Sequence, residues 1–143
     1  MENLNILLVE DNEGDVLLTC EALEEKLNIK NITVARNGNQ AFQILKQFEK
    51  TSVIPDIIVL DINLPHKNGF ELLDIVRRSK KLFKIPVIIL TTSNNLNDQN
   101  KAKIYGANLY LIKPLEADEF ESLAEQIKNF WLNFKNQNNP GLN

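Results

Sequence analysis

The chain has 143 residues, of which 43% are hydrophobic and 24% are charged, and its formal net charge is −3 at pH 7. Such a length and composition are typical of one globular domain with a substantial core. The acidic balance provides no basic face for nucleic acid, and the single cysteine excludes an internal disulfide framework and a cysteine-rich metal site. No apolar run is long enough to span a bilayer, and the N-terminus lacks the features of an export signal. We therefore expect a cytoplasmic protein without membrane contact.

Short apolar runs alternate along the chain with longer stretches in which apolar residues recur at helical spacing. In chain order, the predicted elements are strand 5–9, helix 14–27, strand 32–35, a helix around 41–48, strand 57–60, helix 70–80, strand 86–90, helix 97–105, strand 109–112 and a helix from about 117 past 130. This alternation predicts an α/β fold in which helices cover both faces of one parallel sheet. We assign residues 1–135 to this domain and expect the polar tail, 136–143, to be disordered.

The apolar run at 57–60 leads directly into Asp61. A run of this kind is typical of a strand buried on both faces, so Asp61 is expected at the carboxyl end of a central strand. Ligands bind at that end of the strands in open parallel sheets. Taken alone, Asp61 could equally well only end the strand and stabilise the following turn.

Polar residues also follow the other predicted strands. Glu10 and Asp11 follow the first strand, Thr91 follows the fourth and Lys113 the fifth. Because the carboxyl ends of parallel strands share one edge of the sheet, these side chains can converge on Asp61. Each of them alone could be a loop or capping residue, but together they match one chemistry.

That chemistry is metal-assisted phosphoryl transfer. Three carboxylates and one ammonium group leave an excess of negative charge, which a divalent cation would cancel. Hard oxygen ligands with no His or Cys nearby favour Mg²⁺. A hydroxyl group and a lysine beside a metal-bound carboxylate are the groups that stabilise phosphoryl transfer, and the carboxylate would be the nucleophile.

Over about residues 4–134 the chain resembles the receiver domain of two-component response regulators. The segments that carry the resemblance are the opening strand and acid pair at 6–12, the turn at 35–38 with Ala41, the loop at 61–65 with Gly69, the strand at 86–91 and the closing strand at 106–114. Each segment alone is weak, but together they are highly specific. The resemblance implies the flavodoxin-like (βα)5 three-layer sandwich with strand order 2-1-3-4-5.

The resemblance also implies a role for each matching position around Asp61, which would accept a phosphoryl group from a kinase phosphohistidine. Mg²⁺ or Mn²⁺ would be held by Glu10, Asp11, Asp61 and the backbone carbonyl of Asn63. Many members of the family have Asp where Glu10 stands, and the longer side chain should only lengthen the reach to the metal.

On the other strands, the resemblance implies that Thr91 bonds a phosphoryl oxygen and that Lys113 pairs with the phosphoryl group. The bond between Lys113 and Pro114 is expected to be cis, and Tyr110 would turn inward on activation. Thr92 is bulkier than the Ala often found at its position, which affects the access of partners or water to Asp61.

Two nearby polar residues, His66 and Ser93, have no assigned role. His66 follows Asp61 in an exposed loop, and a lone His without a partner is expected to be solvated.

Because the chain ends soon after the last predicted helix, we expect a stand-alone response regulator that accepts phosphate. Its output would be recognition of the phosphorylated face by another protein or relay of the phosphate onward. Its partners would be a sensor histidine kinase or a histidine phosphotransfer protein, together with a downstream protein target. One alternative is a pseudo-receiver that binds partners without taking phosphate. Another is a metal-dependent aspartyl phosphatase, although such enzymes usually have a second Asp two residues after the nucleophile, where Asn63 stands.

The last predicted helix carries an apolar seam: Phe120, Leu123, Ala124, Ile127, Trp131 and Phe134. Eighteen residues of helix span about 27 Å, against about 17 Å for the strands beneath. We therefore predict that the last turns overhang the sheet and that Phe130, Trp131 and Phe134 extend a homodimer or partner face formed by helix 4, strand 5 and helix 5. The alternative is that they pack back on the body. Small regulators that serve phytochrome-type kinases share a similar aromatic ending.

Overall fold

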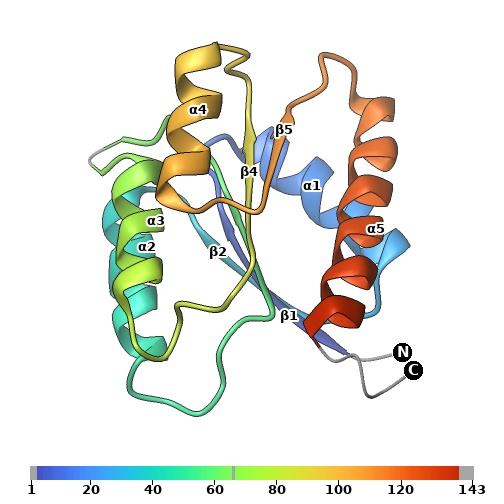
Figure 1. Ribbon diagram of the computed structural model, residues 1–143. Coiled ribbons are helices and arrows are strands. Elements are labelled where there is room, and N and C mark those ends of the chain that lie inside the picture. Colours follow the sequence, from blue (N-terminus) through green and yellow to red (C-terminus); the bar gives the residue numbers. More distant parts are fainter. Residues whose placement is uncertain (1–2, 66, 139–143) are drawn as a thin grey trace.

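Five parallel strands form the central sheet of the computed structural model, which describes residues 3–65 and 67–138 (Figure 1). The order of the strands is β2-β1-β3-β4-β5, which confirms the predicted flavodoxin-like sandwich. In chain order the elements are β1 (Leu4–Val9), α1 (Glu13–Lys26), β2 (Ile29–Ala35), α2 (Gly38–Phe48), β3 (Ile57–Leu60), α3 (Gly69–Arg78), β4 (Val87–Thr91), α4 (Leu96–Tyr105), β5 (Leu109–Ile112), a 3-10 turn (Ala117–Glu119) and α5 (Phe120–Asn138).

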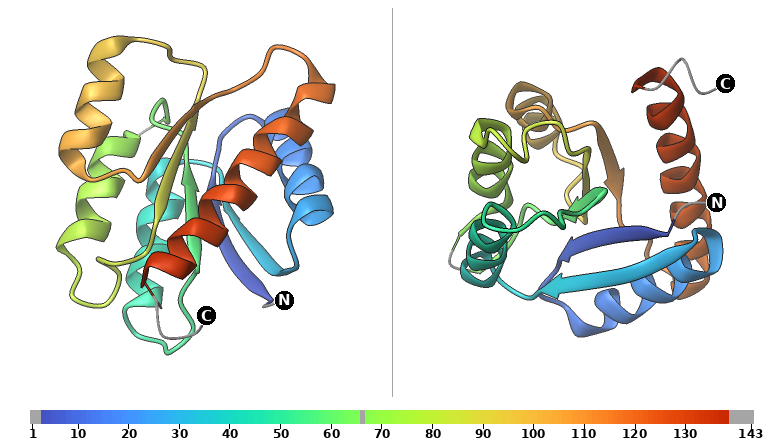
Figure 2. Two further views of the ribbon diagram at one scale, coloured as in Figure 1. Left: turned by 45° about the vertical axis from the view of Figure 1, so that its right-hand side comes forward. Right: turned by 90° about the horizontal axis from the view of Figure 1, so that it is seen from below.

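The helices divide between the two faces of the sheet. Helices α1 and α5 cover one face, and α2, α3 and α4 cover the other (Figures 1 and 2). Alternate residues of β1 enter the two cores: Ile6 and Leu8 pack in the core with α1 and α5, whereas Leu7 and Val9 pack in the core with α2 to α4. From Ile6 to Val9 the strand is therefore apolar at every position, which is why a continuous apolar run predicted it.

Four of the helices begin at asparagines. The side chains of Asn12, Asn37, Asn68 and Asn95 each accept a hydrogen bond from a backbone N–H in the first turn of α1, α2, α3 and α4 respectively. Such caps satisfy donors that have no partner within the helix and contribute about 1 kcal/mol each. At the other end of α4, Gly106 closes the helix with a φ of 95°, a left-handed conformation that favours glycine. These caps define where α1 to α4 begin and where α4 ends.

Several boundaries differ from the predictions by one to three residues, among them the start of β2 and the end of α5. Strand β2 begins at Ile29, three residues earlier than predicted, because Lys30 and Asn31 are polar and exposed on an edge strand and carry no apolar signal. Helix α5 continues to Asn138, so residues 136–138 of the predicted disordered tail are helical. The rest of that tail lies outside the described residues, as does His66.

The aromatic end of α5 packs on the body of the protein. Trp131 is only 9% exposed and belongs to the apolar core that includes Leu4 and Leu27. Phe130 and Phe134 are half-buried and pack against the same core, and the rings of Trp131 and Phe134 stack with centroids 6.1 Å apart. The expected exposure of Trp131 at the end of this helix is therefore not found, because its side chain packs in the core. The role of Phe130, Trp131 and Phe134 in an interface stays a prediction.

Candidate functional site

The carboxyl edge of the sheet brings together the five side chains that the sequence predicted there. Glu10, Asp61, Thr91 and Lys113 are all buried, with exposed fractions of 1%, 5%, 0% and 8%, whereas Asp11 is exposed. Ionisable side chains are rarely buried to this degree unless they are paired. Their burial therefore requires partners.

Lys113 supplies most of that pairing. Its Nζ lies 2.5 Å from Oε1 of Glu10 and 3.0 Å from Oδ2 of both Asp61 and Asp15. Burial alone lowers the pKa of Lys113, but the contacts with Glu10, Asp61 and Asp15 outweigh burial and raise the pKa above its ordinary value. Lys113 therefore carries its charge at neutral pH.

Sequence reasoning missed Asp15 as part of this site. Asp15 lies in the first turn of α1, but Asp11 precedes the helix, so helical spacing does not relate the two side chains and gives no signal for this contact. Its contact with Lys113 joins residues 98 positions apart in the sequence. The ion pair thus connects α1 to the end of β5.

Glu10 is the most deeply buried carboxylate of the site. Burial raises its pKa, although the ammonium group of Lys113 and a hydrogen bond from the backbone N–H of Asn12, 3.1 Å long, both act in the opposite direction. A buried carboxylate would cost several kcal/mol without such partners. The two contacts explain how a charged residue is tolerated at the end of a central strand.

The loop after Asp61 is held by backbone contacts. The N–H of Asp61 donates to the carbonyl of Val9 over 3.0 Å, and the N–H of Asn63 donates to Oδ1 of Asp61 over 3.0 Å. Gly69 closes the loop against α3, because a Cβ at that position would lie 2.5 Å from the carbonyl oxygen of Asp61. The sequence requires glycine there so that the start of α3 can approach the backbone of Asp61 and Ile62.

The acidic residues at this edge fit a divalent cation. Ligand oxygens of Glu10, Asp11 and Asp61 all lie within 4.8 Å of one another. These are hard oxygen donors, the type that Mg²⁺ and Mn²⁺ prefer, and one exposed member leaves room for the waters that Mg²⁺ retains. The residues present therefore fit the predicted metal.

Thr91 is connected to Tyr110 by a chain of hydrogen bonds through Ser93, which had no assigned role. The N–H of Ser93 donates to Oγ1 of Thr91 over 3.3 Å, and the hydroxyl of Tyr110 donates to the carbonyl of Ser93 over 2.8 Å. The Ser93 hydroxyl in turn donates to Asp98 of α4 over 2.6 Å. Burial raises the pKa of Tyr110, so this hydroxyl stays a donor at neutral pH. Displacement of Thr91 would thus disturb both β5 and α4.

The peptide bond between Lys113 and Pro114 is trans, since no cis bond occurs among the described residues. The prediction of a cis bond is wrong for this structure. The preference between the two forms before proline is only about 0.5–1 kcal/mol, and the trans bond still lets Lys113 reach its three carboxylates.

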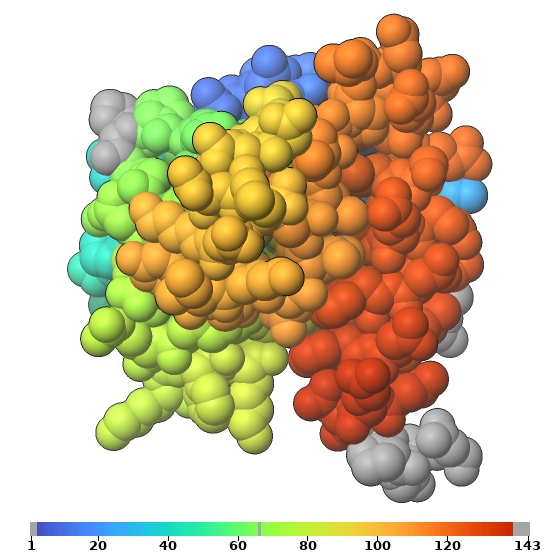
Figure 3. Space-filling view, turned by 45° about the horizontal axis from the view of Figure 1, so that its top comes forward, coloured from blue at the N-terminus to red at the C-terminus, as the bar shows by residue number. Residues whose placement is uncertain are grey.

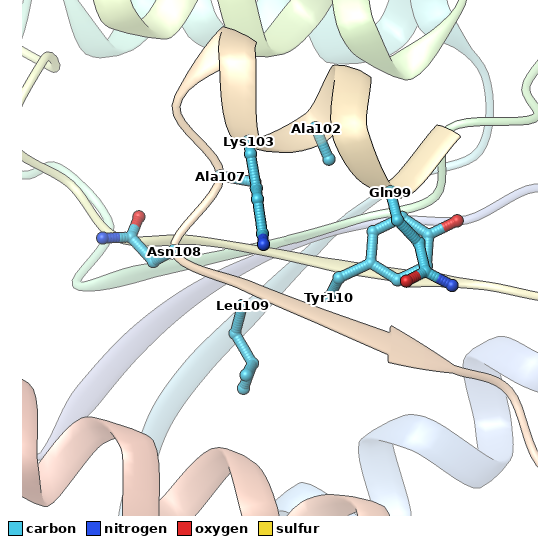
Figure 4. Close-up of a pocket in the computed structure, with 7 residues that line it drawn as sticks. All are labelled: Gln99, Ala102, Lys103, Ala107, Asn108, Leu109 and Tyr110. Atoms are coloured by element: carbon cyan, nitrogen blue, oxygen red, sulfur yellow. The ribbon is translucent and has the colours of Figure 1, made fainter. Parts of the chain in front are cut away.

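A hollow of about 240 Å³ lies between α4 and β5, next to Tyr110. Figure 4 shows Gln99 and Lys103 of α4 reaching toward β5, with Gln99 beside the ring of Tyr110. In the space-filling view, α4 (yellow) adjoins the segment that runs from β5 into α5 (orange to red) on one face (Figure 3). Any movement of Tyr110 would therefore change the surface between α4 and β5.

Comparison with known proteins decides the family. The sequence-family model of the response regulator receiver domain matches residues 6–125 of this chain. The chain belongs to the response regulator receiver family. This result confirms the resemblance drawn from the sequence. No helix in the described residues is both long and apolar enough to cross a bilayer.

Several relatives are similar over most of their length. The chain is 36% identical to the probable methanogenesis regulatory protein FilR2 of Methanothrix harundinacea over 94% of this chain and 88% of the relative. It is 35% identical to the response regulator Rcp1 of Synechocystis, over 89% of this chain and 88% of Rcp1. The Mn²⁺-bound structure of Rcp1 superposes with a TM-score of 0.81, covering 90% of this chain and 94% of that one. The phosphorylated cyanobacterial phytochrome response regulator RcpA superposes with a TM-score of 0.84 at 33% identity, covering 92% of this chain and 95% of that one.

Proposed function

We propose that this receiver domain accepts a phosphoryl group on Asp61, in a reaction that depends on Mg²⁺ or Mn²⁺. The donor would be the phosphohistidine of a sensor histidine kinase or of a histidine phosphotransfer protein. The observation that carries the proposal is the buried Asp61 carboxylate, which lies beside the ammonium group of Lys113 and within one metal-binding group with Glu10 and Asp11.

The chemistry follows from these groups. A carboxylate oxygen of Asp61 attacks phosphorus, the P–N bond of phosphohistidine breaks as the P–O bond forms, and the electron pair leaves with the imidazole nitrogen. Before metal binds, Asn63 and Lys113 each bond one oxygen of the Asp61 carboxylate, and the Asn63 N–H keeps its contact with Oδ1 independent of the lysine. A divalent cation would be held by Glu10, Asp11, Asp61 and the backbone carbonyl of Asn63. It would neutralise negative charge on the phosphoryl oxygens. Lys113 and the Thr91 hydroxyl would bond the transferred group.

Signalling would use the α4–β5–α5 face. If Thr91 moves to bond the phosphoryl group, the hydrogen bonds from Thr91 through Ser93 to Tyr110 give that movement a path to β5. Ile104 on α4 and Ile112 at the end of β5 are exposed apolar side chains on these elements. A second copy of this chain or a downstream target protein would bind there, and the half-buried Phe130 and Phe134 would border the contact.

Two alternatives are less well supported. A pseudo-receiver would not need the complete set of three acids, Thr91 and Lys113 that the sheet edge brings together. An aspartyl phosphatase would need a second acid two residues after Asp61, and the N–H of Asn63 instead bonds Asp61 there. The stand-alone role stays a prediction.

The test is incubation with acetyl phosphate and Mg²⁺, followed by intact-mass measurement. The proposal predicts an adduct of one phosphoryl group in the wild type and none in Asp61→Asn. An absent adduct in a folded wild type would favour the pseudo-receiver, and rapid hydrolysis of the donor without an adduct would favour the phosphatase. A Mg²⁺-dependent adduct in Asp61→Asn would refute the assignment of Asp61.

A further inference from the structure

Asp15 is the one partner of Lys113 that the proposed phosphoryl chemistry does not use. Its Oδ2 lies 3.0 Å from Nζ of Lys113, on the α1 side of the ammonium group. Among the described residues, the group able to hold a metal consists of Glu10, Asp11 and Asp61 and does not include Asp15. The side chain of Asp15 is 27% exposed, whereas that of Lys113 is 6% exposed. Asp15 thus connects a buried cation to the hydrated start of α1.

Lys113 and a divalent cation require the same carboxylates. The ammonium group occupies Oε1 of Glu10 at 2.5 Å and Oδ2 of Asp61 at 3.0 Å. A metal ion bound to these two side chains would stand close to a positive charge, and like charges at such distances repel each other. Binding of the metal therefore requires the ammonium group to move away from at least part of this pair.

The geometry points to Asp15 as the residue that makes this movement possible. We propose that Asp15 is a positioning residue, which holds the Lys113 ammonium group toward α1 and so leaves Glu10 and Asp61 available to the metal. The inference rests on the proposed metal role of the acidic residues.

The start of α1 is well suited to this task. The backbone N–H of Asp15 donates to the cap residue Asn12 over 2.9 Å, which fixes the first turn of the helix. The backbone of Asp15 is thereby held at a position from which its carboxylate reaches Lys113. Without it, the ammonium group would pair with Glu10 and Asp61 alone and would compete more strongly with the metal.

The experiment is a Mg²⁺ titration of the full chain by calorimetry, with no phosphodonor present. Asp15→Asn should weaken Mg²⁺ binding about fivefold. A change of this size corresponds to the loss of one partly exposed ion pair. In a Lys113→Met background, where no ammonium group competes, the same substitution should weaken binding by less than about twofold. Asp15→Glu keeps the charge and should recover most of the wild-type affinity.

Glu13 provides a matched control on the same turn. Its carboxylate pairs with Arg36 and not with Lys113. Glu13→Gln removes the same charge from the first turn of α1, so it should leave the Mg²⁺ affinity within about twofold of the wild type. Circular dichroism of each variant establishes that the titrated protein is folded.

The outcomes separate this inference from the proposed function. An equal loss of affinity in both backgrounds would show that Asp15 acts by its charge or as a ligand and would overturn the positioning role. An unchanged affinity in Asp15→Asn would overturn it as well. If the wild type and Asp11→Asn both failed to bind Mg²⁺, the metal role itself would be wrong, and this inference would fall with it.

Discussion

The two ends of the sheet are both buried, but in physically different ways. At the carboxyl edge, Glu10, Asp61 and Lys113 are charged, and each depends on its partners. At the opposite end, Trp131 and Phe134 stack against an apolar core with no requirement for a specific partner. A buried polar group therefore requires particular partners at particular positions, whereas a buried apolar group requires only a surface that covers it.

The largest expected effect belongs to the apolar end. Trp131→Ala should lower the free energy of unfolding by about 3–4 kcal/mol, because it leaves a cavity in the core shared with α1. Phosphorylation by acetyl phosphate should proceed at the wild-type rate in the folded fraction. Chemical denaturation and intact mass measure the two quantities. Wild-type stability together with the loss of a dimer would place Trp131 in an interface after all.

At the carboxyl edge, stability should respond to the metal. Mg²⁺ at about 100 times its dissociation constant should stabilise the wild type by about 2.7 kcal/mol, since it binds only the folded state. Asp11→Asn removes one ligand and should lose most of this gain at the same concentration. Thermal unfolding with and without Mg²⁺ tests the difference. An equal rise in melting temperature for both proteins would exclude Asp11 as a ligand.

Removal of the ammonium group tests how strongly the polar site depends on its partners. Lys113→Met should cost about 2 kcal/mol without metal, because Glu10 and Asp61 are left buried without their cation. Saturating Mg²⁺ should recover much of this loss. Lys26→Met is the control, since Lys26 pairs with Glu121 and Glu125 on the surface, and its removal should leave stability unchanged within error. A metal-independent loss in Lys113→Met would indicate that packing, and not charge, holds this lysine.

The smallest effect concerns a polar group in the apolar region. Thr19 of α1 is 1% exposed, and its hydroxyl has no hydrogen-bond partner among the described residues. Thr19→Val replaces this hydroxyl with a methyl group of similar size, so it should raise the free energy of unfolding by about 1 kcal/mol. Urea denaturation measures the change. A loss of stability would mean that the hydroxyl is satisfied in solution.

The sequence predicted the elements and the polar edge for the same reason. Apolar runs such as 57–60 permit only buried strands, and a parallel sheet then brings Asp61 and Lys113 to one edge without any knowledge of loops. Asp15 could not be predicted, because its contact joins residues 98 positions apart and depends on how α1 sits on the sheet. Trp131 was misplaced for a different reason: an apolar helical seam has the same pattern whether it faces a core or a partner.

The proposed phosphoryl transfer depends most directly on Asp61 being the nucleophile. Treatment of the phosphorylated protein with borohydride reduces an acyl phosphate to an alcohol and releases phosphate, which converts a phosphorylated Asp to homoserine. Peptide mapping then locates the modified residue. We expect homoserine at position 61 alone, and only when Mg²⁺ and the phosphodonor were both present. Homoserine at position 11, or an adduct that borohydride leaves intact, would contradict the assignment.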